Sequence, residues 1–124
     1  MTPELEALAR RAVACPRWRW MPGMAYLRRG KRHRVDSDVL ANGGSYDETC
    51  IPDLTDPATL GCLLALVREA WGDPGFYAAQ SGTKIKGTDI FGWDTFGYLH
   101  GKSCKGMLYR SEAEALVAAL EVGP

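Results

Sequence analysis

The segment DLTDPATLGCLLALVREAWGDPG, residues 53–75, constrains the fold more than any other part of the chain. It predicts a helix that is capped by Thr55 or Asp56 and ends at Gly72. Its interior carries two charged side chains, and apolar side chains cover most of its circumference. Such a helix must be covered on more than one side. We therefore expect it at the centre of the fold or in a dimer interface.

Two further helices are predicted, one near each end of the chain. Residues 3–14 place apolar side chains on one stripe, behind a capping Thr2. The sequence SEAE, which starts at Ser111, has the form of a capping box. It opens a helix whose alanine, leucine and valine side chains are expected to face inward.

The segment RWRWM, residues 17–21, predicts a strand between the first two helices. Side chains alternate between the two faces of a strand, so Trp18 and Trp20 would share one face and the arginines the other. A pair of large aromatic side chains contributes much buried area, which favours the core over a ligand site. We expect Arg17 and Arg19 to be exposed on the opposite face.

The remaining segments complete an α+β pattern. Residues 24–40 predict either two short strands joined at an Arg-Gly pair or a mobile basic excursion, and residues 41–53 predict a loop. Residues 76–110 predict strands with glycines at turns. We expect a single domain, residues 1–124, of three helices packed with a small antiparallel sheet in the order helix-strands-helix-strands-helix.

Composition places the chain among ordinary globular proteins. It is 46% apolar and 24% charged, and a chain of 124 residues can bury one core. No apolar run has the length of a membrane span, and the N-terminus lacks the basic start and apolar core of an export signal. We therefore expect no membrane association and a location in the bacterial cytoplasm.

Charge is segregated along the sequence although the net charge is zero. Nine of the fifteen Lys and Arg residues precede Val35, and eight of the fifteen acids lie between Asp36 and Asp73. A molecule with a basic and an acidic part is suited to docking on a charged partner.

Residue types that carry catalysis or bind metals form no complete motif. The cysteines, at positions 15, 50, 62 and 104, lack the close pairs that zinc sites use. HGKSCKG, residues 100–106, is preceded by a glycine one residue too close for a phosphate-binding loop. Cys104 with His100 would make a thiol nucleophile only with a third, orienting group that the sequence does not identify. We expect no cofactor, no metal and no enzymatic activity.

Four blocks carry a resemblance to a known group of proteins: LEALARRAVAC, WRWMPGM, PDLTDPATLGCLLALVREAWG and SEAEALVAALE. Together they resemble small, mostly uncharacterised phage and prophage proteins, and the layout is similar to the phage αβα-sandwich domain. The resemblance implies an accessory protein that works in the cytoplasm of the host bacterium by binding and blocking host machinery. Anti-CRISPR inhibitors are one such class, with a CRISPR effector as the partner.

Two hypotheses of function follow. The first is an inhibitor or adaptor that binds a host protein; the second is direct binding of nucleic acid through the basic segment RRGKRHR, residues 28–34, with nearby aromatic rings stacked on bases. Both use the same cations, and the apolar central helix adds the expectation of a homodimer. The residues expected to contact the partner are Arg17, Arg19, Arg28, Arg29, Lys31, Arg32, Arg34, Lys84, Lys86, Lys102 and Lys105.

Overall fold

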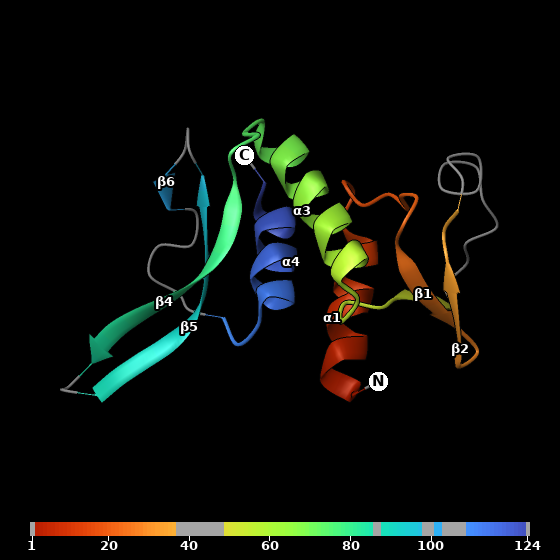
Figure 1. The fold of residues 1–124 in the computed structure, drawn as a ribbon, viewed down its shortest axis with the longest axis horizontal. Helices are drawn as coiled ribbons and strands as arrows, with labels where there is room; N and C mark the ends of the chain where they lie inside the picture. Colours follow the sequence, from red (N-terminus) through yellow and green to blue (C-terminus); the bar gives the residue numbers. More distant parts are fainter. Residues whose placement is uncertain (1, 37–48, 86–87, 98–100, 103–108, 124) are drawn as a thin grey trace.

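A computed structural model gives the arrangement of the chain and describes residues 2–36, 49–85, 88–97, 101–102 and 109–123. The elements in chain order, drawn in Figure 1, are α1 (Pro3–Ala14), β1 (Ala25–Arg28), β2 (Lys31–Arg34), β3 (Cys50–Pro52), α3 (Pro57–Trp71), β4 (Tyr77–Ile85), β5 (Thr88–Gly97), β6 (Gly101–Lys102) and α4 (Glu112–Val122). The predicted α+β fold and its order of helices and strands are confirmed.

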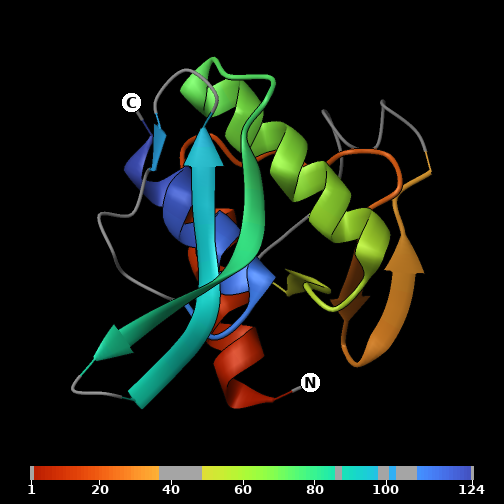
Figure 2. The same ribbon diagram turned by 60° about the vertical axis from the view of Figure 1, so that its left-hand side comes forward.

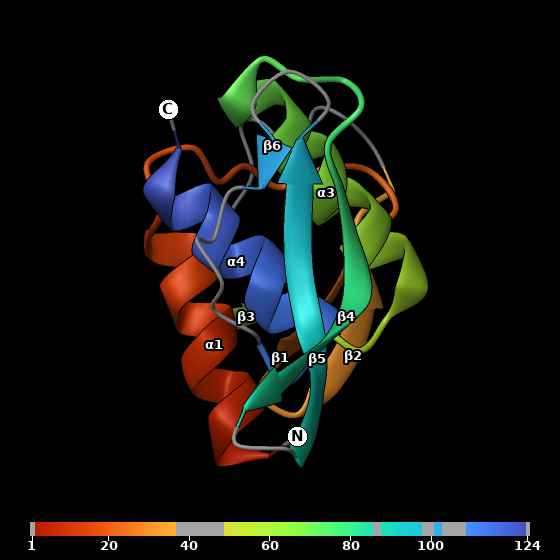
Figure 3. The ribbon, with the colours of Figure 1, turned by 90° about the vertical axis from the view of Figure 1, so that its left-hand side faces the viewer.

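The strands form two separate sheets instead of one. The first sheet has the order β2-β1-β3 and the second has the order β4-β5-β6, and every strand pair in them is antiparallel. Figure 1 shows the helices between the two sheets, and Figure 3 shows β4 and β5 crossing α4. The helices are therefore the middle layer, whereas an αβα sandwich has its sheet in the middle.

Helix α3 forms as its sequence predicts. The Asp56 side chain accepts a hydrogen bond from the Thr59 N–H at 3.0 Å and caps the first turn. Gly72 ends the helix in the left-handed conformation, with φ of 61°, which favours glycine. Leu63 and Val67 are fully buried, and the Trp71 Nε1 donates to the Ala119 carbonyl of α4 at 2.9 Å. The helix lies beside α4 in the helical layer (Figure 1).

The outer helices also follow their sequence signals. Thr2 accepts from the Leu5 N–H and caps α1. Ser111 accepts from the Glu114 N–H at 3.1 Å and caps α4. The inward side chains predicted for α4 are all buried in the core: Ala113, Leu116, Val117 and Leu120.

The strand predicted at residues 17–21 is wrong, because this segment has no strand partner among the described residues. Pro16 and Pro22, at either side of it, lack the N–H that a ladder requires. Arginine side chains attach the segment to the C-terminal end of α3 instead: Arg17 donates to the Ala70 carbonyl at 2.6 Å. Trp20 is still buried, with 9% of its surface exposed, and belongs to the core.

The loop predicted at residues 41–53 is wrong in its last part. Cys50–Pro52 form β3, which pairs with β1 in the register Tyr26↔Pro52 and Arg28↔Cys50. A three-residue strand is too short to show a period, and its partner lies far away in the sequence. The earlier residues of the predicted loop, 41–48, lie outside the described part of the chain.

Candidate binding site on the basic hairpin

The basic segment folds into a tight β-hairpin, so the alternative of a mobile excursion is wrong for residues 28–34. Strands β1 and β2 pair from Ala25↔Arg34 to Arg28↔Lys31, and Arg29 and Gly30 form the turn. Both turn residues have positive φ, 52° and 79°. Two consecutive positive values are the mark of a type I′ turn, whose twist matches that of the flanking strands.

The pairing divides the hairpin side chains between two faces. Since side chains alternate along each strand, Ala25, Leu27, Arg32 and Arg34 share one face, and Tyr26, Arg28, Lys31 and His33 share the other. All four residues of β2 are exposed. We call the first set the acid-bound face and the second set the aromatic face.

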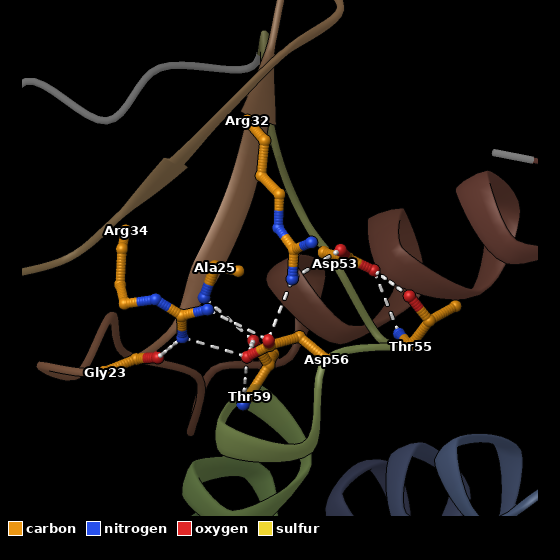
Figure 4. A network of polar contacts seen from close by, with 8 residues as sticks. All are labelled: Gly23, Ala25, Arg32, Arg34, Asp53, Thr55, Asp56 and Thr59. Atoms are coloured by element: carbon orange, nitrogen blue, oxygen red, sulfur yellow. Dashed lines mark hydrogen bonds and ion pairs between the residues drawn. The ribbon is translucent and has the colours of Figure 1, made fainter.

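On the acid-bound face, two arginines bind carboxylates at the start of α3 (Figure 4). Arg34 holds Asp56 through two nitrogens, at 3.0 and 3.1 Å, and also donates to the Gly23 carbonyl at 2.6 Å. Arg32 lies 2.8 Å from Asp56 and 3.4 Å from Asp53. These two cations are therefore balanced within the molecule.

Asp56 joins the hairpin to the central helix. Its side chain is 7% exposed, and one oxygen accepts from both the N–H and the hydroxyl of Thr59. The Thr59 hydroxyl oxygen accepts from the Ala25 N–H at 2.8 Å, which ties β1 to the same turn (Figure 4). The hydrogen bonds from Arg34 are the main cause that lowers the pKa of Asp56 well below its usual range, and the bonds from Thr59 lower it further.

A series of four rings connects the aromatic face to the core. Trp18 and Trp20 meet edge to face at 5.5 Å, and Trp20 meets Tyr26 at 5.6 Å. Tyr26 stacks on His33 with ring centres 5.2 Å apart. His33 is exposed, so the series ends at the surface. The tryptophans pack behind Tyr26, on the side away from the surface.

The predicted contact residues do not gather in one place. The five hairpin cations lie together, but Arg17 and Arg19 bind Ala70 and Glu69 at the other end of α3. A helix of 15 residues separates its ends by about 20 Å. Lys86 and Lys105 lie outside the described residues, as do the side chains of Lys84 in β4 and Lys102 in β6.

The cations of the hairpin differ in what they contact. Arg28 donates to the Cys50 sulfur at 3.3 Å and is half-buried. Arg29 and Lys31 are exposed at the tip, and within the described ranges no ion pair or side-chain hydrogen bond involves either of them. Sequence reasoning missed the acidic partners Asp53 and Asp56. The segregation of charge along the sequence was the available signal, since the basic segment folds back on the acidic one.

The other candidate residues form no second site in the part of the chain that the structure describes. Cys15, Cys50 and Cys62 are free thiols, and burial raises the pKa of Cys15 and of Cys62. Among the residues that the structure describes, no three His, Cys, Asp or Glu side chains form a group that could hold a metal ion. His100 and Cys104 lie outside these residues. None of the described helices has the length and apolar content to span a bilayer.

Comparison with protein families, with curated proteins and with solved structures finds no match for this chain. The resemblance to phage proteins therefore stays a prediction from the sequence.

Proposed function

We propose that this protein is a non-enzymatic inhibitor or adaptor that binds an acidic region of a host protein through the β1–β2 hairpin. The observation that carries the proposal is the exposed strand β2, with two cations at its tip and a stacked tyrosine and histidine beside them. Arginine and aromatic side chains are enriched at protein interfaces. The resemblance to phage proteins supports a host bacterial partner, with anti-CRISPR inhibition of a CRISPR effector as the leading case.

The distribution of ion pairs favours an acidic protein over nucleic acid. Binding to a phosphate backbone gains affinity from each cation that releases a counterion. Arg32 and Arg34 already hold carboxylates, and this leaves Arg29 and Lys31 as the hairpin cations without a partner in the described structure. Complementary charge steers and selects a folded partner, whereas strong phosphate binding needs several cations.

Reversal of one charge at the tip tests this function. We expect Lys31→Glu to weaken partner binding by about tenfold or more, because the partner would then face a like charge at the interface. Stability should change by less than about 0.5 kcal/mol, since Lys31 is exposed. The measurement is capture of proteins from a bacterial lysate on the immobilised protein, followed by affinity measurements with the partner and by cleavage assays with purified CRISPR effectors.

Arg110→Glu is the matched control. Arg110 is also exposed, and it lies before α4 in a hollow that it shares with α1 and not with the hairpin, so this variant should keep the partner. Equal retention of the partner by both variants, or no specific partner at all, would contradict the proposed function.

Nucleic-acid binding remains the second candidate, favoured by the exposed His33 ring stacked on Tyr26 beside cations. If it occurs, we expect a shallow salt dependence. Two cations give a slope of log K against log salt of about −1.4 for a single strand, against about −3.5 for all five hairpin cations. Fluorescence anisotropy with a labelled oligonucleotide at several salt concentrations measures the slope. A steep slope would show that Arg32 and Arg34 leave their carboxylates, and no complex at low salt would remove this candidate.

A further inference from the structure

We propose that the partner contributes an extended acidic segment that adds to the first sheet as a new strand alongside β2. This inference rests on the proposed function, because it specifies how the hairpin would bind a protein. In the described part of the chain β2 is the outer strand of the order β2-β1-β3. Figure 1 and Figure 2 both place it at the periphery of the molecule.

The register shows which backbone groups of β2 are available. A hairpin with a two-residue turn closes on a hydrogen-bonded pair, here Arg28↔Lys31. Hydrogen-bonded and non-hydrogen-bonded pairs alternate in an antiparallel ladder, so His33 bonds to β1 and Arg32 and Arg34 do not. The Val35 N–H donates to the Met24 carbonyl at 2.8 Å, as this alternation requires. The N–H and C=O groups of Arg32 and Arg34 therefore point outward, toward an added strand.

The side chains around this edge select an acidic segment. Arg32, His33 and Arg34 line an open hollow of about 360 Å³. The arginines already bind Asp53 and Asp56, so the charge that is not yet balanced is that of Lys31, on the opposite face of the strand beside the His33 ring. A carboxylate of an added strand would meet Lys31, where opposite charges across strands are favourable.

The same cations oppose pairing of β2 with a second copy of itself. Two copies paired edge to edge would bring the basic strands Lys31–Arg34 against each other, and like charges directly opposite are destabilising. Lysine on an edge strand is a known protection against such self-pairing. An acidic strand meets no such repulsion. The charge of β2 therefore favours an acidic partner segment over a second copy of this chain.

Proline and alanine at residue 32 form a matched pair that tests the backbone contact. Arg32→Ala keeps the outward N–H and removes the side chain; Arg32→Pro removes both, and proline is tolerated on an edge strand where the N–H faces solvent. The probe is a short capped peptide that alternates glutamate and threonine, with a control peptide of equal charge that has proline at its centre. We expect the alanine variant to bind the probe and the proline variant to bind about tenfold more weakly, through the loss of one hydrogen bond of about 1.4 kcal/mol.

Amide hydrogen exchange of the unaltered protein provides a measurement that needs no variant. Addition of the alternating peptide should slow exchange at Arg32 and Arg34, while the control peptide should leave both unchanged. Equal binding of the two peptides, equal affinity of the two variants, or unaltered exchange would overturn strand addition. If strand addition is overturned but Lys31→Glu still releases the lysate partner, the proposed function stands and the partner docks on side chains. If strand addition is overturned and Lys31→Glu keeps the partner, both proposals fail.

Discussion

Replacing Trp20 with alanine is expected to lower the free energy of unfolding by about 4 kcal/mol, the range observed when a buried aromatic side chain is removed from a core. Trp20 is 9% exposed, and its ring contacts both the Trp18 and the Tyr26 rings. No nearby backbone ladder would hold the segment in place, because residues 17–21 form no strand. Urea unfolding followed by circular dichroism measures the change.

Two other variants separate a core role of Trp20 from a ligand-binding role. Trp20→Phe keeps an apolar ring and should recover more than half of the lost stability. His33→Ala removes the exposed end of the same series of rings and should alter stability by less than about 0.5 kcal/mol. If Trp20→Ala unfolds at the same urea concentration as the unaltered protein but loses its partner, the tryptophan faces the ligand and the core assignment is wrong.

Replacing Asp56 with alanine is expected to lower the free energy of unfolding by about 2 kcal/mol. Loss of the helix cap accounts for about 1 kcal/mol. The rest comes from the hydrogen bonds that Arg34 and Thr59 make to this nearly buried carboxylate. The loss stays below that of a fully buried ion pair because the Arg32 and Arg34 side chains are half exposed and can be hydrated again.

The pH dependence of stability tests whether the charge of Asp56 accounts for the stability that Asp56→Ala loses. The folded protein lowers the pKa of Asp56, so its contribution is fully present above the unfolded pKa, near 3.9, and is lost as the pH falls below that value. Asp56→Asn keeps a capping oxygen but removes the charge, so we expect a smaller loss at pH 7 and a weaker decline of stability in acid. An unchanged decline would assign the acid sensitivity to other carboxylates.

Local signals explain why most of the helices and turns could be predicted. Helix caps and terminators act on backbone groups within a few residues, so their effect can be predicted from the sequence. The examples here are Thr2, Asp56, Ser111 and Gly72. The Arg29-Gly30 turn, one of the two alternatives that the sequence left for the basic segment, also depends on local φ values. Apolar side chains cover most of the circumference of α3. They predicted burial on several sides without any knowledge of its neighbours.

Long-range pairing explains what could not be predicted. The alternation of residues 17–21 suggested a strand, but a strand also needs a partner, and none is present in the described structure. Cys50–Pro52 gave no periodic signal, yet β1 supplies a ladder for them. The division of the strands between two sheets depends on the same distant pairings.

The sequence by itself determined three capped helices, a basic segment and the separation of positive from negative charge, since each depends on neighbours along the chain. Only the tertiary structure decided which of those charges are paired within the molecule. The chain brings Asp53 and Asp56 against Arg32 and Arg34, and Coulombic attraction at about 3 Å then neutralises two arginines that looked available for a partner. In the described structure, the exposed outer strand β2 keeps Lys31 without an ion-pair partner, and our proposals rest on this edge.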